Sequence, residues 1–187
     1  YRLLANYVLK QQNGEGGWGI YTGAPTDISA TVKAYILLRL AGYKPEWELM
    51  QSVRDVILKH GGINKVNSFT KIYLALIGEF PWKGVPAIPP EMILIPSIAP
   101  INIYEMSSWS RTIFVPLSII YALKPVCPLP PECRIDELFP AGHTHRDLAL
   151  PRTKEPLSWT NFFLLTDKAL KAAELFPINP VRQVAIK

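Results

Sequence analysis

Two cysteines and two histidines are the residues best able to hold a metal ion. Cys127 and Cys133 lie six positions apart in a proline-rich stretch, and His143 and His145 follow within a dozen residues. Structural zinc sites usually contain paired ligands separated by about two to four residues. The Cys-x5-Cys and His-x-His spacing lacks such a tight cysteine pair, so we predict no metal site. A disulfide is the alternative for the cysteines, but two cysteines form no framework and we expect reduced thiols.

Carboxylates that could act together as an acid are not grouped in this sequence. Glu91 and Glu105 are lone carboxylates, for which helix capping or ion pairing is the favoured interpretation over a general-acid pair. We therefore predict no catalytic residue within the chain. No two of its five aspartates fall within four residues of each other: Asp27, Asp55, Asp136, Asp147 and Asp167.

The composition describes a chain with a core and with long irregular connections. Hydrophobic residues make up 49% of the 187 residues, and charged residues make up 19%. The 18 prolines are about twice the usual share. A net charge of +5 without runs of Lys and Arg argues against a nucleic-acid partner. We see no secretory signal and no run of about 18 apolar residues that could span a membrane. The first residue is not Met, and we expect a piece of a longer protein.

Helical periodicity dominates the pattern and no convincing strand appears, so the predicted fold class is all-α. Asp27, Asn67 or Ser68, and Ser107 or Ser108 are suitable N-caps. Residues 124–157 are predicted to form a long proline-rich connection. The expected helices cover 3–12, 28–40, 46–59, 69–80, 109–123 and 159–176, with shorter ones at 89–94, at 101–106 and from Pro180.

The most specific motif follows the first expected helix. It consists of Gln12, three residues, Gly16, Gly17 and Trp18, preceded by the pair Tyr7-Val8. A glutamine amide can bond free backbone groups at a helix end, glycine permits the tight turn, and Trp18 can cover the glutamine. No Lys-Ser/Thr follows, so the glycines form no phosphate-binding loop. The motif resembles the QW repeat of triterpene cyclases. A glycine turn with an incidental tryptophan is the alternative, and Gln12, Gly16 and Trp18 are structural in either case.

Further stretches resemble bacterial squalene–hopene cyclases in the same order along the chain, and the similarity extends from about residue 3 to about residue 185. The narrowest of them is Asn-Ile-Tyr-Glu-Met-Ser-Ser-Trp-Ser-Arg at 102–111. Others lie at 70–82, 85–91, 128–130 and 137–138. The loosest part is the connection 139–157.

The resemblance implies a fold and an activity. Each subunit in that family has two α–α barrels, squalene folds in the cavity between them, and a DxDD motif protonates a terminal alkene. Aromatic faces stabilise the carbocation, and no cofactor is needed. This chain contains no DxDD, so it resembles the N-terminal barrel alone. We expect residues 1–187 to form a single partial domain of helix pairs with proline-rich loops.

The resemblance also implies partners and a location. Squalene, a membrane surface and the C-terminal barrel of the same enzyme are the expected partners, with a homodimer as a further candidate. The expected location is the cytoplasmic face of a membrane, as a monotopic protein. Two alternatives stay open. One is another terpene cyclase of the same fold, of the tetraprenyl-curcumene or oxidosqualene type. The other is a non-catalytic lipid-binding or scaffolding α-toroid.

Three residues acquire expected roles through the resemblance. Trp109 matches a family tryptophan that lines the cyclisation cavity, with a core or capping aromatic as the alternative. Met106 and Phe114 match positions that narrow the hydrophobic entrance channel. Their helical spacing leaves a plain core role equally open for both.

The helix expected at 159–176 has an apolar face and a charged face, which is typical of a helix lying in a membrane interface. The charged face excludes a crossing of the hydrocarbon core. Residues 140–187 contain seven basic and four acidic side chains, which suits an anionic surface. The alternative is a helix whose apolar face packs on the protein core. The apolar face contains Trp159, Phe162, Phe163, Leu165, Ala169, Leu170, Ala173 and Phe176.

Overall fold

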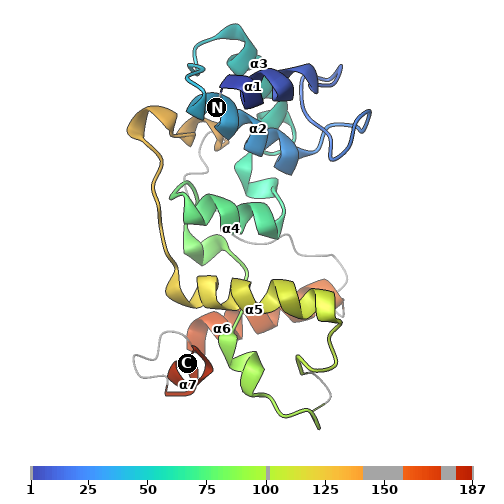
Figure 1. Cartoon of the computed structure of the whole chain (residues 1–187), viewed down its shortest axis with the longest axis vertical. Coiled ribbons are helices and arrows are strands. Elements are labelled where there is room, and N and C mark those ends of the chain that lie inside the picture. The colour runs from blue at the N-terminus through green and yellow to red at the C-terminus, as the bar shows by residue number, and fades with distance from the viewer. Residues whose placement is uncertain (1, 100–101, 141–157, 174–179, 187) are drawn as a thin grey trace. The chain divides into compact units, whose positions relative to one another are not determined.

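The computed structural model describes residues 2–99, 102–140, 158–173 and 180–186 (Figure 1). Within these ranges every regular element is a helix and none is a strand, which confirms the predicted all-α class. The chain divides into two compact units. Unit 1 contains Tyr1–Val85 and Val126–Ala149, and unit 2 contains Pro86–Pro125 and Leu150–Lys187. The expectation that residues 1–187 form a single partial domain stays a prediction.

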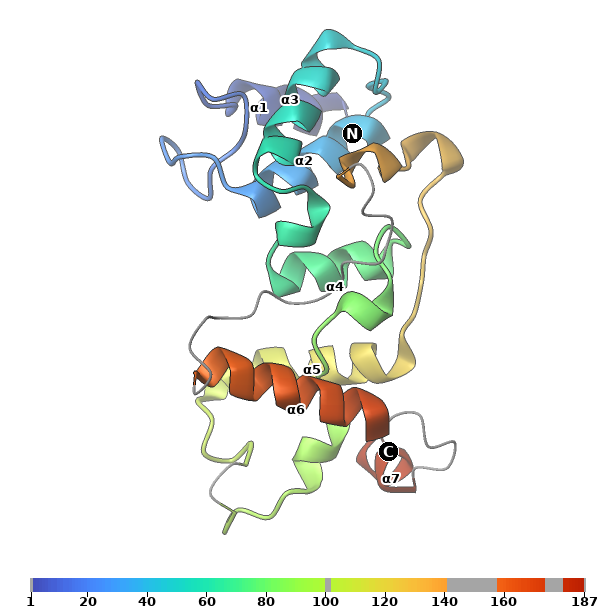
Figure 2. The ribbon, with the colours of Figure 1, turned by 180° about the vertical axis from the view of Figure 1, so that it is seen from behind.

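Unit 1 is built around helix α2. In both views α1, α2 and α3 lie close together (Figure 1, Figure 2), and α2 contacts both of its neighbours. The α-helices of the unit are α1 (Arg2–Lys10), α2 (Ile28–Leu40), α3 (Glu48–Lys59) and α4 (Ser68–Leu76). Its short 3-10 helices are η1 (Ile63–Lys65), η2 (Trp82–Gly84), η4 (Pro131–Cys133) and η5 (Asp136–Leu138).

Helix α2 is central because it is apolar on nearly all sides, which is typical of a helix surrounded by protein. Val32, Tyr35 and Leu38 on this helix are all fully buried. The side chain of Asp27 accepts a hydrogen bond from the Ala30 N–H at 2.7 Å, which confirms the predicted N-cap. Such a cap satisfies one of the free N–H groups of the first turn.

Helix α4 begins where predicted and ends earlier. Asn67 is its N-cap and accepts from the Thr70 N–H at 2.9 Å. The helix ends at Leu76, so the predicted extension to residue 80 is wrong. Instead of a further turn, the carbonyls of Leu76 and Ile77 accept hydrogen bonds at 2.7 and 3.2 Å from N–H groups in the segment 126–129. Gly78, with φ 79°, supplies the left-handed residue that ends the helix.

The segment 130–138 is bound to α2 and to the end of α4 by buried polar side chains. Arg39, only 8% exposed, donates to the carbonyls of Glu132 and Arg134. The Tyr35 hydroxyl donates to a Glu137 carboxylate oxygen at 2.7 Å, and burial raises the pKa of Tyr35. These bonds join parts of the chain that are more than ninety residues apart in sequence.

Glu79, which follows α4 in sequence, adds a further bond to this attachment. Its side chain is 6% exposed and accepts the Ile135 N–H at 3.1 Å. Loss of solvent around the carboxyl raises the pKa of Glu79, with the hydrogen bond from Ile135 acting in the opposite direction. Ionisation of this group therefore costs folding free energy.

Unit 2 consists of η3 (Pro90–Leu94), α5 (Ser108–Leu123), α6 (Trp159–Ala173) and α7 (Pro180–Ile186) among its described residues. The predicted short helix near residues 89–94 is present as η3. Ser107 is the N-cap of α5 and accepts from the Ser110 N–H at 3.1 Å. The element η3 packs against both α5 and α7.

Two helices predicted in unit 2 differ from the structure or extend beyond the described residues. A helix at 101–106 was predicted, but residues 102–106 form a turn, and residue 101 lies outside the described residues. The helix predicted to end at residue 176 is described as far as Ala173. Within α6, an Asp167 carboxylate oxygen accepts the Ala87 N–H at 2.6 Å, which fastens this helix to the chain before η3.

Replacing Glu79 by Gln should raise the melting temperature at neutral pH, because the amide oxygen keeps the bond to Ile135 without a buried charge. A carboxyl whose folded pKa is raised contributes stability that is lost as the pH rises through that pKa. The advantage of Glu79→Gln should therefore vanish below the ordinary pKa of about 4.5 and grow above it. Thermal melts from pH 4 to 8 measure this.

Glu132→Gln is the matched control, because Glu132 is exposed in the same segment. Its melting temperature should follow that of the unmodified protein across the pH range. A difference between Glu79→Gln and the unmodified protein that is constant at every pH would contradict the argument.

Candidate functional site

The QW-like motif forms a compact loop after α1, in which the two named side chains have different partners. The Gln12 side chain donates to the Gly16 carbonyl at 2.8 Å and so closes its own loop. Trp18, only 5% exposed, donates its indole N–H to the Val8 carbonyl at 2.7 Å. The tryptophan, rather than the glutamine, therefore binds a carbonyl at the end of α1. Gly16, with φ 81°, has the left-handed conformation that the tight turn requires.

Asn13 organises the same loop and was not identified from the sequence. Its amide oxygen accepts from the N–H groups of Glu15 and Gly17, each at 3.1 Å. Its amide nitrogen donates to the Thr26 hydroxyl at 3.0 Å. A Cβ on Gly17 would lie 2.5 Å from Thr26, so this position has no room for a side chain. The signal was present, because asparagine before glycine is a typical turn former.

Trp109 lies in the first turn of α5 and is 77% exposed. It is therefore not buried in the core of unit 2, and the alternative of a core or capping aromatic in the complete protein stays untested. Its role in a cyclisation cavity stays a prediction. Met106 lies in the turn before the helix and is partly exposed.

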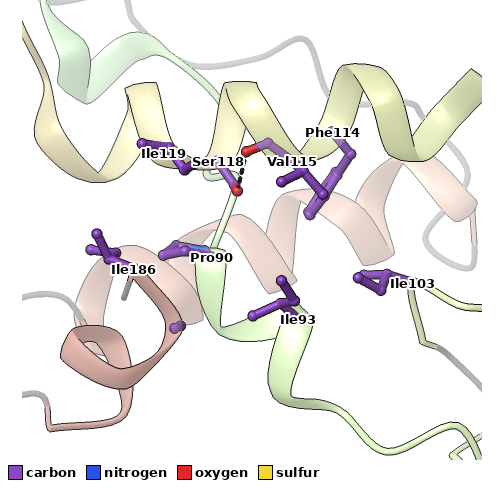
Figure 3. Close-up of a pocket in the computed structure, with 9 residues that line it drawn as sticks. Pro90, Ile93, Ile103, Phe114, Val115, Ser118, Ile119 and Ile186 are labelled. Carbon is purple, nitrogen blue, oxygen red and sulfur yellow. Dashed lines mark hydrogen bonds between the residues drawn. The ribbon is translucent and has the colours of Figure 1, made fainter.

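An apolar cavity of about 200 Å³ lies within unit 2 (Figure 3). The Ser118 hydroxyl, its most polar side-chain group, donates to the Val115 carbonyl at 2.7 Å. Phe114 lines this cavity, whereas Trp109 and Met106 do not. The channel roles of Phe114 and Met106 stay predictions. The lining consists of Pro90, Ile93, Ile103, Phe114, Val115, Ser118, Ile119, Ala185 and Ile186.

An ion pair holds α7 at the edge of this cavity. Arg182 Nε lies 2.7 Å from Glu91 Oε1, with the two side chains 20% and 22% exposed. Glu91 is thus an ion-pair residue, as the sequence favoured. Glu105, the other lone glutamate, is exposed.

Three large apolar side chains of α6 are exposed. Phe162, Phe163 and Leu165 are 51, 62 and 69% exposed, whereas the carboxyl side chain of Asp167 is 15% exposed. These three side chains are thus not buried within residues 1–187, while both the membrane contact and the packing of this face on the core of the complete protein stay predictions. Nothing is described of the Trp159 side chain. Of the described helices, none is both long and apolar enough to cross a membrane.

Of the four residues weighed as metal ligands, the structure describes the two cysteines and not the two histidines. Cys127 is exposed, Cys133 is buried, and both are free thiols. His143 and His145 lie outside the described residues. Within the described ranges, no three side chains of His, Cys, Asp or Glu are grouped as metal ligands.

The whole chain, residues 1–187, matches the model of the squalene–hopene cyclase N-terminal domain. The chain belongs to the squalene–hopene cyclase family. It is part of the α–α barrel of that family, as the QW-like motif and the stretch 102–111 predicted.

Named relatives agree with this membership of the squalene–hopene cyclase family. The chain is 36% identical over 182 residues to the squalene–hopene cyclase of Alicyclobacillus acidocaldarius, covering 97% of this chain and 28% of the relative. For the squalene–hopene cyclase of Zymomonas mobilis the identity is 38% over 186 residues, covering 98% and 27%. A dammaradiene synthase from Dryopteris crassirhizoma is 34% identical over 185 residues, covering 98% and 27%. The chain thus spans little more than a quarter of these relatives' length.

Replacing Trp18 by Phe should remove the indole hydrogen bond to Val8 while keeping an aromatic ring. The free energy of unfolding should fall by about 0.5–1.5 kcal/mol, the usual net value of one hydrogen bond, or by more if the Val8 carbonyl is left without solvent. Denaturant unfolding of the complete protein measures this change. Trp47→Phe is the control, because Trp47 is 48% exposed. An equal loss in both variants would show that the indole bond has no special weight.

Proposed function

We propose that the complete protein containing this chain converts squalene into pentacyclic hopene, and that the chain forms part of its substrate-binding structure. The observation that carries the proposal is the match of the squalene–hopene cyclase N-terminal domain to all of residues 1–187. The reaction is an isomerisation. A proton adds to a terminal alkene, the rings close through successive carbocations, and a proton leaves at the end, so no cofactor is consumed.

The proton donor of this reaction is assigned to the rest of the protein. An alkene is a weak base, so its protonation requires a strong and preorganised acid, whereas an isolated aspartate has a pKa of about 4. No two aspartates of this chain are within four residues of each other. The chain covers only 28% of the relative from Alicyclobacillus acidocaldarius, so most of such an enzyme lies outside it.

The role of this chain in the reaction is to form apolar and aromatic parts of the wall of the substrate cavity. Trp109, 77% exposed, leaves an indole face free for a molecule outside unit 2. An aromatic face attracts a cation by roughly 0.5–2 kcal/mol, and this attraction grows where water is excluded. Phe114 and Met106 are proposed to narrow the path by which the hydrocarbon enters.

Other products and a purely structural role are the alternatives. The dammaradiene synthase relative is 34% identical over nearly the whole chain, which favours a cyclase with a different product as the second candidate. Cyclases of the tetraprenyl-curcumene or oxidosqualene type belong to the same alternative. A lipid-binding module without activity is the third. A homodimer stays a prediction.

Incubation of the complete protein with squalene should yield hopene, whereas residues 1–187 alone should yield none above a control without protein. Gas chromatography with mass spectrometry identifies the products. A different ring system from the complete protein would favour the second candidate, and turnover of oxidosqualene alone would change the substrate. Binding without turnover would support the non-catalytic module. Hopene formed by residues 1–187 alone would overturn the assignment of the acid.

We further propose that α6 lies in one leaflet of a membrane, at its cytoplasmic face. The support is the exposure of Phe162, Phe163 and Leu165 on a helix whose Asp167 faces the unit. Lys168 is exposed on the same helix and can reach anionic headgroups. Contact with the bilayer would give a substrate dissolved there a path that avoids water.

The double variant Phe162→Glu/Phe163→Glu of the complete protein should lose binding to vesicles of phosphatidylcholine and phosphatidylglycerol, with a nearly unchanged melting temperature. Two charges on an interfacial face oppose insertion, and both side chains are already more than half exposed to solvent within this chain. Vesicle flotation measures the binding.

Phe69→Glu/Tyr73→Glu is the matched control, because these aromatics are 60 and 41% exposed on α4 in unit 1. This control should keep its vesicle binding. A folded Phe162→Glu/Phe163→Glu protein that still floats with vesicles would rule out this helix as the anchor.

A further inference from the structure

Asn102 is a deeply buried amide whose side chain makes four hydrogen bonds. It is 2% exposed. Its nitrogen donates to the carbonyls of Ala99 at 2.7 Å and Ser97 at 3.2 Å. Its oxygen accepts from the N–H groups of Tyr104 at 2.8 Å and Glu105 at 3.0 Å. The full donor and acceptor capacity of an asparagine side chain is two N–H donors and two lone pairs, so the amide is completely satisfied.

These four bonds join two stretches of backbone on either side of Asn102. The carbonyls belong to the proline-rich segment before it, and the N–H groups belong to the turn that leads into α5. This turn occupies the place where the sequence predicted a short helix. Ile103, in the middle of this turn, is buried and lines the apolar cavity. The Met106 N–H donates to the Ile103 carbonyl at 3.3 Å, which closes the turn.

The turn sets where the first residues of α5 lie. Only Ser107, the N-cap, separates Met106 from the start of the helix. Trp109 follows in the first helical turn and, being 77% exposed, has little packing within unit 2 to hold its ring. The position of its indole therefore depends on the backbone that precedes it. Asn102 is the buried side chain that fixes this backbone.

No other side chain of similar size replaces this amide fully. Aspartate would keep the two acceptor bonds and lose both donor bonds, while adding a buried charge. Leucine would lose all four and leave backbone groups in a buried site without partners, which is costly. The arrangement thus requires an amide at position 102.

We propose that Asn102 is a positioning residue for the substrate-facing end of α5, and that it holds Trp109 and Met106 where the hydrocarbon and its carbocations pass. This inference rests on the proposed function, because it assumes that Trp109 faces substrate in the complete enzyme. Asn102 itself touches no reacting atom. It acts through the turn, so its loss changes which products form as well as how fast.

The test uses Asn102→Leu, Asn102→Asp and Trp109→Ala in the complete protein, assayed with squalene below the melting temperature of each variant. Displacement of a reacting group by about 1 Å can cost about 100-fold in rate. Asn102→Leu should lower kcat at least tenfold and increase incompletely cyclised products, in the same pattern as Trp109→Ala. Asn102→Asp keeps the bonds to the turn and should recover part of the normal product ratio.

Asn67→Leu is the matched control. Asn67 also uses its side chain to hold backbone before a helix, but it caps α4 in unit 1. This variant should melt earlier and keep the normal product ratio. If Asn102→Leu behaves like Asn67→Leu, with lower stability and unchanged products, the positioning role is overturned.

Hydrogen exchange of the peptide covering 103–110 provides a second measurement that needs no activity. Exchange should be faster in Asn102→Leu and less so in Asn102→Asp, while α2 stays protected. Unchanged exchange in this peptide would overturn the inference. If Asn102→Leu fails to fold, both the product ratio and the hydrogen exchange are measured on Asn102→Asp. If the unmodified complete protein makes no cyclised product, the proposed function fails, and the exchange result still decides whether Asn102 fixes the turn.

Discussion

Unit 1 depends on the burial of one guanidinium group among backbone carbonyls. Arg39 projects from the central helix α2 and donates to the carbonyls of Glu132 and Arg134. Burying a cation without hydrogen-bond partners would cost much folding free energy. The segment 130–138, which supplies these carbonyls, must therefore pack on α2 when Arg39 is buried. Glu79 and Tyr35 attach the same segment. Two stretches of chain separated by about a hundred residues therefore fold as one unit.

The same principle explains how a proline-rich chain remains ordered between its helices. Proline removes backbone donors and interrupts helices, so the remaining N–H and C=O groups of the connections need other partners. In this protein amide and carboxyl side chains supply them. Asn13 holds the loop after α1, Asn102 holds the turn before α5, and Asp167 accepts the Ala87 N–H. These side chains thereby provide the hydrogen bonds that a helix would otherwise provide for the backbone.

Local features of the fold could be predicted from the sequence, whereas features that depend on distant partners could not. The N-caps Asp27 and Asn67 were predicted because a cap and its N–H lie within three residues. The end of α4 at Leu76 was missed because the donors that replace the next turn come from 126–129. The turn at 102–106 was predicted as a helix because its apolar pattern is visible and the four bonds of Asn102 are not.

In the candidate site, too, local features could be predicted and features that depend on distant partners could not. The family was recognisable because motif residues and their spacing are local, and the amphipathic pattern of α6 was visible for the same reason. The sequence left open whether that apolar face points to the core or outward, and it gave no sign that Phe162 and Phe163 are exposed within this chain. The exposure of Trp109 is likewise a feature that no pattern in the sequence could supply.

The bond between Ala87 and Asp167 has a consequence for how these two positions can drift in evolution. The donor at position 87 is a backbone N–H, which every amino acid except proline provides. The bond itself therefore excludes only proline at this position, although prolines stand at 86 and 89 on either side. Position 167 supplies the acceptor from a side chain and tolerates few replacements. Related proteins that keep this contact would need a residue other than proline at position 87 and a hydrogen-bond acceptor on the side chain at position 167.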